Sequence, residues 1–260
     1  AFLVRQAIKT FIRTKKMETE FEQKSTQLER SNAELEQFAG VAAHDLRSPI
    51  KSMHSWIDLL EHSLPKLRPE GVDEALTYIR HNTKKADALI EDILEIARVN
   101  RRDMLVGPVD LNKTVFDILL TLDQQIKDIG AEVNVRTLPV VEGNQSCLES
   151  VFSNLIRNAL TYHEKTRKPL ITIGCDNKTD KYEFFVQDNG IGIESSDSRQ
   201  VFEMFKRFHN NRDYPGTGIG LAFCKKVIDL CGGNIWVKSV PGQGSTFFFT
   251  YPAKPVWEGQ

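Results

Sequence analysis

The residues around His44 are of the types that a nucleophilic histidine needs. Asp45 follows His44 directly, and Pro49 comes five residues after it in a stretch that otherwise predicts helix. Near neutral pH much of an exposed imidazole is uncharged, so one ring nitrogen carries a lone pair for attack. A proline inside a helix clashes with the carbonyl four residues back, here that of Asp45, and costs about 3 kcal/mol. A bend beside His44 is therefore predicted, and its cost favours a functional histidine.

The helix that carries His44 has an apolar stripe with a seven-residue repeat, as in a coiled coil. The repeat consists of Phe21, Leu28, Leu35 and Ala42. If Ala42 is a core position, His44 lies on the side facing away from the seam. A turn at 64–71 precedes a second stripe, made of Leu76, Ile79, Thr83, Ala86, Ile90, Ile93 and Ala97. Two such helices predict an antiparallel hairpin, and two hairpins should pair as a dimeric four-helix bundle.

Gly107-Pro108 ends the helical region, and a mixed α+β sandwich is predicted after it. We expect helices at 112–127, 147–162 and 218–230, and strands at 132–136, 170–175, 182–187, 235–239 and 246–251, the last two forming a hairpin. The predicted domains are a coiled-coil helix (1–37), a helical hairpin (38–105) and a sandwich (106–256).

Three polar elements in the predicted sandwich suit a phosphorylated ligand. Asn154 and Asn158 share one helix face, and amide oxygens can bind magnesium. Asp188 ends a strand and is followed by Gly190 and Gly192, which permit a tight turn close to a ligand. The loop from Gly216 to Leu221 opens a helix, whose free N–H groups favour phosphate. Each element alone is weak support, but together they predict a nucleotide site.

Phe202, Phe205 and Phe208 recur every third residue between the two glycine elements. On a short helix these three rings would form one apolar face, and packing in the core is the simplest interpretation.

The His44-Asp45-Leu46-Arg47-Ser48-Pro49 run resembles the phosphoacceptor box of sensor histidine kinases, and the resemblance continues to about residue 250. It implies a Bergerat-type ATP-binding sandwich, autophosphorylation of His44 with Asp45 helping to accept its proton, and transfer to an aspartate of a response-regulator receiver domain. Many members also dephosphorylate their partner through a Thr or Asn, and Ser48 stands at that position. Two-component signalling by a homodimer is the implied role.

The same resemblance implies roles for residues in the sandwich. Asn158 would bind magnesium, Asp188 would bind adenine, and Arg207 would reach the terminal phosphate from a flap over the nucleotide. Thr161 stands where the family has a basic residue, and Arg157, His163 or Lys165 could replace it. The implied nucleotide-contacting set is Asn154, Asn158, Tyr162, Asp188, Gly190, Gly192, Gly216, Thr217, Gly218, Gly220, Leu221 and Thr246.

The composition excludes some classes of partner and location. Lysine and arginine number 34 against 35 aspartates and glutamates, so no net field favours nucleic acid or an anionic membrane. The four cysteines show no metal-ligand spacing and are expected to be reduced core residues. No apolar run approaches the roughly 20 residues that span a bilayer. A soluble, cytoplasmic fragment is expected, with an upstream sensor outside it and a parent protein either soluble or membrane-anchored.

Two alternatives share the predicted nucleotide fold. One is an ATP-driven clamp like the gyrase and heat-shock chaperone relatives, which would hydrolyse ATP without a stable phosphoprotein. The other is a dimeric scaffold that binds nucleotide but signals only through helix rotation.

Overall fold

The computed structural model describes residues 15, 46–47, 49–60, 71–98, 107–194, 197–198, 200–206 and 217–253. The chain divides into two compact units, Ala1–Arg80 and His81–Gln260. The predicted coiled coil and the bend beside His44 lie outside the described residues. Within the described residues, no helix has the length and apolar character needed to cross a membrane.

Two helical segments on either side of the turn confirm the expected hairpin. Residues 49–60 are helical, and helix α2 (Val72–Arg98) begins after Gly71, whose φ of 91° is accessible to glycine. Asp73 and Glu74 in the first turn of α2 favour its positive dipole end. Arg80 forms an ion pair with Asp58 at 2.9 Å, which joins the two segments side by side.

The predicted apolar stripe of α2 is largely present. Leu76, Thr83 and Ile90, seven residues apart, are all buried. Ile79 departs from the prediction because its side chain is 46% exposed. Leu94 and Ile96, which the predicted stripe omitted, are buried near the end of the helix.

The second unit is built on a five-stranded sheet in the order β2-β4-β5-β7-β6. The strands are β2 (Glu132–Val135), β4 (Leu170–Asn177), β5 (Lys181–Asp188), β6 (Ile235–Val240) and β7 (Gly244–Pro252). Only the β2–β4 pair is parallel. The hairpin of β6 and β7 was predicted correctly, although β7 starts two residues before the expected Thr246.

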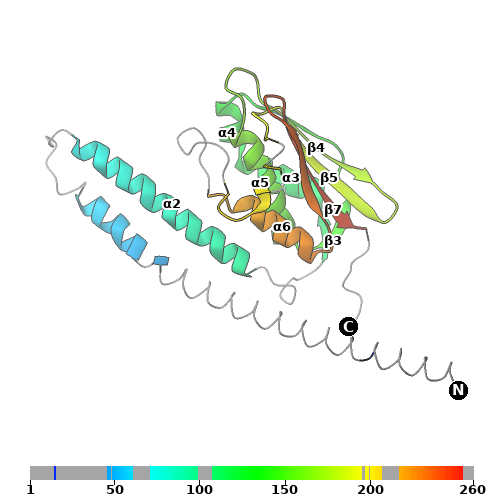
Figure 1. Cartoon of the computed structure of the whole chain (residues 1–260), viewed down its shortest axis with the longest axis horizontal. Coiled ribbons are helices and arrows are strands. Elements are labelled where there is room, and N and C mark those ends of the chain that lie inside the picture. Colours follow the sequence, from blue (N-terminus) through cyan, green and yellow to red (C-terminus); the bar gives the residue numbers. More distant parts are fainter. Residues whose placement is uncertain are drawn as a thin grey trace, which may run out of the picture. The chain divides into compact units, whose positions relative to one another are not determined.

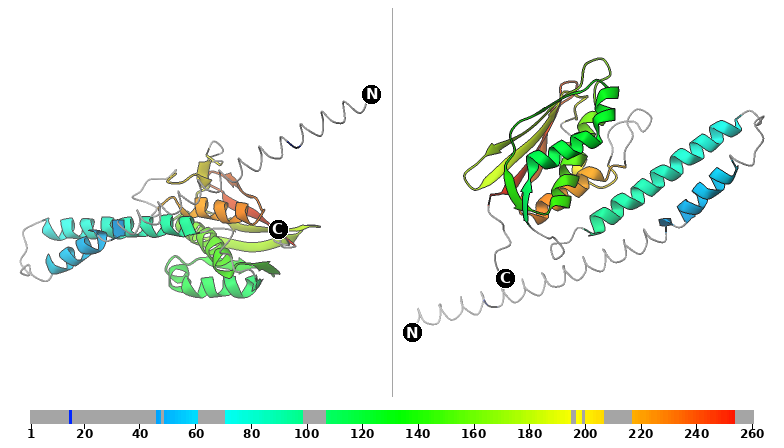
Figure 2. Two further views of the ribbon diagram at one scale, coloured as in Figure 1. Left: turned by 90° about the horizontal axis from the view of Figure 1, so that it is seen from below. Right: turned by 180° about the vertical axis from the view of Figure 1, so that it is seen from behind.

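Three helices lie on one face of this sheet (Figures 1 and 2). They are α3 (Leu111–Thr121), α5 (Gln145–Thr161) and α6 (Gly220–Leu230). The expected helix 112–127 is interrupted at Leu122, after which the short helix α4 (Asp123–Asp128) follows. Asp110 caps α3 by accepting hydrogen bonds from the N–H groups of Asn112 and Lys113.

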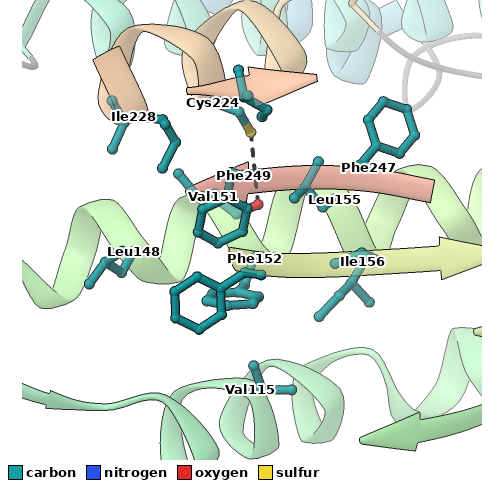
Figure 3. Close-up of a cluster of buried hydrophobic side chains, with 14 of the residues drawn as sticks. Val115, Leu148, Val151, Phe152, Leu155, Ile156, Cys224, Ile228, Phe247 and Phe249 are labelled. Atoms are coloured by element: carbon teal, nitrogen blue, oxygen red, sulfur yellow. Dashed lines mark hydrogen bonds between the residues drawn. The ribbon is translucent and has the colours of Figure 1, made fainter. Parts of the chain in front are cut away.

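The core lies between α5 and the sheet, as Figure 3 shows. Phe152 of α5 meets Phe184 and Phe249 edge to face, with ring centroids 5.8 and 5.4 Å away. All three rings are fully buried. Because α5 is held rigidly by these contacts, its polar edge is held in place as well. Cys224 and Cys231 are buried, as expected of core residues, whereas Cys147 and Cys175 are only partly buried, and none of the four forms a disulfide within the described residues.

A second, two-stranded sheet was not predicted. Strands β1 (Gly107–Asp110) and β3 (Val140–Gly143) pair antiparallel, with Val109 opposite Val141. Both of these valines are buried in the core.

The expected apolar face of phenylalanines is wrong in part. The 3-10 helix η2 spans only Gln200–Phe202, and Phe202 packs edge to face on Phe247. Phe205 lies beyond that helix with a φ of 63° and is 59% exposed. Phe208 lies outside the described residues.

Candidate nucleotide-binding site

Helix α5 carries the asparagines that the sequence singled out. The side chain of Asn144 caps the helix by accepting a hydrogen bond from the N–H of Cys147. The opposite face of α5 is buried, so Asn154 and Asn158, one turn apart, share an edge that lines a cavity. A side chain at position 220 would place its Cβ 2.3 Å from the amide oxygen of Asn154, so a residue other than glycine there would push the Asn154 side chain aside. The helix and the glycine loop are thereby in direct contact.

Asp188 ends β5, and its carboxylate is held by two backbone donors. Its Oδ1 accepts hydrogen bonds from the N–H of Gly190 at 2.8 Å and from the N–H of Ser245 at 3.1 Å. Burial raises the pKa of Asp188 to about 6, although these two N–H groups and the charge of Arg167 act to lower it. Within the described residues Oδ2 has no hydrogen-bond partner, so this oxygen remains to accept from a ligand.

Gly190 and Gly192 let the chain turn tightly after Asp188. The Cβ of any other residue at 190 would lie 2.3 Å from the carbonyl oxygen of Tyr162. Gly192 has a φ of 73°, and a Cβ there would meet the carbonyl oxygen of Val240 at 2.2 Å. Both glycines are therefore required by close backbone contacts, as the sequence predicted.

The glycine loop leads into α6, which begins at Gly220, two residues later than predicted. Among the described residues no side chain caps this helix, and N–H groups at a helix start suit an anion. The hydroxyl of Thr217, before the helix, donates a hydrogen bond of 2.5 Å to the carboxylate of Asp92 on α2. The pKa of Asp92 is raised above its usual value, chiefly because the carboxyl is buried, and the hydrogen bond from Thr217 offsets part of this rise.

These elements surround two adjoining cavities that share five lining residues: Asn158, Tyr162, Val201, Lys206 and Leu221. The first cavity is largely apolar, with Asp188 in its wall, and is otherwise lined by Ile191, Gly192, Ile193, Ser245 and Phe247. The second is polar, measures about 310 Å³, and is otherwise lined by Asp92, Gln125, Asn154, Arg157, Thr161, Thr217, Gly218 and Gly220. An apolar cavity containing one carboxylate, continuous with a polar one, matches a base joined to phosphates.

Most of the predicted nucleotide-contacting residues meet at these cavities. Gly190 lies directly behind the first one. Thr246 does not line either cavity, whereas its neighbours Ser245 and Phe247 line the first. Successive residues of a strand point to opposite faces, so Thr246 points away from the ligand side. His44, Asp45, Arg207 and Gly216 lie outside the described residues.

Four lining residues with charged or polar side chains were not predicted from the sequence, and one of them, Ser245, is the neighbour of the predicted Thr246. Lys206 lines both cavities and directly precedes the predicted Arg207. Two adjacent basic residues, Lys206 and Arg207, could therefore have indicated that Lys206 also lies near the phosphates. Asp92 and Gln125 come from distant parts of the sequence, and no local pattern indicated either. Arg157, one of the proposed substitutes for a basic residue at 161, lines the polar cavity together with Thr161.

The fold and this pair of cavities define a nucleotide-binding ATPase domain, and comparisons with known proteins agree. The family described as "Histidine kinase-, DNA gyrase B-, and HSP90-like ATPase" matches residues 143–255, and the "His Kinase A (phospho-acceptor) domain" matches residues 34–102. The two matches together cover most of the chain. The chain belongs to the sensor histidine kinases.

Several relatives share this arrangement. The phytochrome-like protein Cph1 of Synechocystis is 38% identical over 90% of this chain, and the sensor protein kinase WalK of Staphylococcus aureus is 27% identical over 90%. The chain spans 31% of the Cph1 sequence and 57% of the WalK sequence. The crystal structure of full-length ShkA with AMPPNP shares the fold, with a TM-score of 0.67 and 22% identity over 85% of this chain and 46% of that one.

Proposed function

We propose that this chain uses ATP to phosphorylate His44 and passes the phosphoryl group to an aspartate of a response regulator. The proposal rests on one observation above all: a carboxylate in an apolar cavity joins a polar cavity lined by amides and glycines, in a chain that also carries the His44–Pro49 box. Among the relatives that match 90% of this chain, FilI of Methanothrix harundinacea is named a methanogenesis regulatory histidine kinase, and WalK is named a sensor protein kinase. A histidine kinase has also been solved with its response regulator, as ThkA with TrrA.

The apolar cavity suits adenine. Oδ2 of Asp188 would accept a hydrogen bond from the exocyclic amine, while Oδ1 stays bound to the backbone. Ile191, Ile193 and Phe247 supply apolar surface for the base. A buried acceptor of this kind discriminates against a base that presents another acceptor at the same place.

The polar cavity suits the triphosphate and magnesium. Arg157 and Lys206 supply positive charge there, and the uncapped start of α6 supplies N–H groups. The described residues include no cluster of three or more His, Cys, Asp or Glu side chains able to hold a metal ion. Magnesium bound through the amide oxygen of Asn158 and through phosphates needs no such cluster. When bound, the ion would offset negative charge on the transferring phosphate.

His44 would be the nucleophile, and Asp45 would accept its proton as the N–P bond forms and the bond to the ADP oxygen breaks. Arg207, on the proposed flap, would stabilise charge on the terminal phosphate. The aspartate of the response regulator would then attack phosphohistidine. Ser48 would support any phosphatase activity.

A homodimer is proposed from the surface of the helical hairpin. Large apolar side chains of the helix at 49–60 remain 46–65% exposed: Met53, Trp56, Leu59 and Leu60. An exposed apolar face of this size on a short hairpin requires a partner, and a second hairpin would complete a four-helix bundle.

The chain should become labelled when incubated with γ-labelled ATP and magnesium, and the label should be lost in acid and kept in base, as expected for phosphohistidine. Adding a receiver domain should move the label to it. Release of inorganic phosphate without a labelled protein would instead support the ATP-driven clamp. Nucleotide binding with neither labelling nor phosphate release would support the scaffold.

Asp92 is expected to weaken ATP binding, because its carboxylate lines the cavity proposed for the phosphates. Asp92→Asn keeps an oxygen that can accept from Thr217 but removes the negative charge. We expect this variant to bind ATP about three- to tenfold more tightly, an effect reduced by added salt. Thr217→Val is the matched variant that removes the hydrogen bond and keeps the charge. If Asp92→Asn weakens binding in a titration calorimeter, the carboxylate helps to hold the ligand and this expectation is wrong.

A further inference from the structure

Arg167 lies in the loop between α5 and β4 and binds the turn that follows Asp188. Its Nη2 donates a hydrogen bond of 2.6 Å to the carbonyl oxygen of Gly190. Its Nε is buried and has no protein partner within the described residues. Arg167 is half-buried, whereas its neighbours Lys165 and Lys168 are exposed. The guanidinium is therefore built into the back of the turn, while the neighbouring lysines lie at the surface.

The same loop and the first residue of β4 hold the turn through five hydrogen bonds: Ile191 N to Tyr162 O, Arg167 Nη2 to Gly190 O, Asn189 Nδ2 to Lys168 O, Leu170 N to Asn189 Oδ1, and Asn189 N to Leu170 O. The peptide between Gly190 and Ile191 is bound on both sides, since its carbonyl accepts from Arg167 and its N–H donates to Tyr162. Only the Arg167 bond carries a charge, and charge-assisted hydrogen bonds are the stronger kind.

Fixing this peptide fixes the carboxylate in front of it. The N–H of Gly190 is one of the two backbone donors to Oδ1 of Asp188, so a rotation at Gly190 would leave that oxygen held only by the N–H of Ser245 and would change where Oδ2 points. Arg167 does not itself line either cavity. Within the described residues it is also the one charged side chain whose charge acts on Asp188, and it favours the carboxylate form.

We propose that Arg167 is a positioning residue for nucleotide recognition: its guanidinium, bound behind Gly190, holds the 188–191 turn so that the Asp188 carboxylate points into the apolar cavity. This inference rests on the proposed adenine-binding role of Asp188. The guanidinium of Arg167 would then orient the Asp188 carboxylate and also favour its ionised form. This role differs from that of the basic residue which the family has near the phosphates, because Arg167 contacts the turn at the end of the site proposed for adenine.

The test is a titration of ADP and GDP into the whole chain and its variants at pH values on both sides of 6. In the unaltered chain, ADP affinity should fall as pH drops through about 6, because a protonated Asp188 can no longer accept from the base. Arg167→Gln should weaken ADP binding about tenfold at neutral pH and raise the midpoint of this acid limb by roughly half a pH unit or more. The ratio of ADP affinity to GDP affinity should fall in the same variant.

Two further variants separate positioning from a structural role. Lys168→Gln removes the adjacent cation, which is 66% exposed and paired with Glu132, and should leave affinity and midpoint unchanged. Arg167→Lys keeps the positive charge but loses the guanidinium geometry. Its ADP affinity should therefore fall, while the midpoint of its acid limb should stay closer to that of the unaltered chain than the midpoint of Arg167→Gln does. If Arg167→Gln does not fold, the ADP-to-GDP ratio of Arg167→Lys provides the test.

The proposal is overturned if both Arg167 variants keep the original affinity and base discrimination. It is also overturned if Arg167→Gln weakens binding with an unmoved midpoint and unchanged discrimination, because a merely structural loss gives that result. Failure of the proposed nucleotide site, on which this inference rests, would look different, because the unaltered chain would then bind neither ADP nor GDP.

Discussion

His44→Gln should reduce labelling by γ-labelled ATP below detection, a loss of about a thousandfold or more, because it removes the attacking nitrogen. Nucleotide binding should stay as it is, because the described residues that line the proposed nucleotide cavities supply the groups expected to bind the base and the phosphates. Measuring protein-bound label and ADP affinity on the same preparation tests both parts of this expectation.

A second histidine provides the matched control for this loss. His81 is an exposed residue of α2, and His81→Gln should label at the original rate. If the His44 variant still accepts the label, the phosphoacceptor lies elsewhere. If the His44→Gln variant loses nucleotide binding as well, His44 also takes part in binding the nucleotide, and the proposed division of roles is wrong.

The parts of the site that depend on short-range patterns could be predicted from the sequence. Asn154 and Asn158 share a helix face because residues four apart always do. Asp188 at a strand end, with glycines two and four residues later, predicted a tight turn, and the close contacts at Gly190 and Gly192 explain why glycine is needed. Each of these inferences needs only a few neighbouring residues.

The parts that depend on strand phase or distant contacts could not be predicted. The resemblance implied that Thr246 contacts the nucleotide, whereas β7 turns its neighbours Ser245 and Phe247 toward the apolar cavity. A shift of one residue reverses which face a side chain occupies. The pairing of β1 with β3 is long-range in the same way, as is the hydrogen bond between Thr217 and Asp92.

Arg167 shows a third kind of limit. Its loop contains three other basic side chains, His163, Lys165 and Lys168. Arg157, His163 or Lys165 was the substitute that the sequence suggested near the phosphates. The structure places Arg167 against Gly190, 23 positions along the chain, and only that contact distinguishes it from its neighbours.

Asp188→Asn should weaken ATP binding by about 100-fold, although it changes one oxygen into an NH2 group. The backbone N–H groups of Gly190 and Ser245 both need an acceptor at the δ1 position, so the amide oxygen should turn toward them. The amide nitrogen then faces the cavity as a donor, opposite the donating amine of adenine. GTP presents an acceptor there, so discrimination between ATP and GTP should narrow or reverse.

The same substitution should stabilise the protein without nucleotide. Because burial raises the pKa of Asp188 to about 6, the folded state binds a proton more tightly than the unfolded state does, and stability falls as pH rises through about 6. An asparagine cannot ionise, so Asp188→Asn should avoid up to about 3 kcal/mol of this loss at neutral pH. Below the pKa of an unfolded aspartate the two proteins should differ little.

Thermal unfolding of the nucleotide-free chain and calorimetric titration with ATP and GTP measure the two effects together. Asp176→Asn is the matched control: an exposed aspartate of β4 that should change neither quantity. A carboxylate kept buried at a cost to stability needs a ligand to account for it. If Asp188→Asn binds ATP normally, or destabilises the protein at neutral pH, this carboxylate is a structural part of the turn and does not recognise adenine.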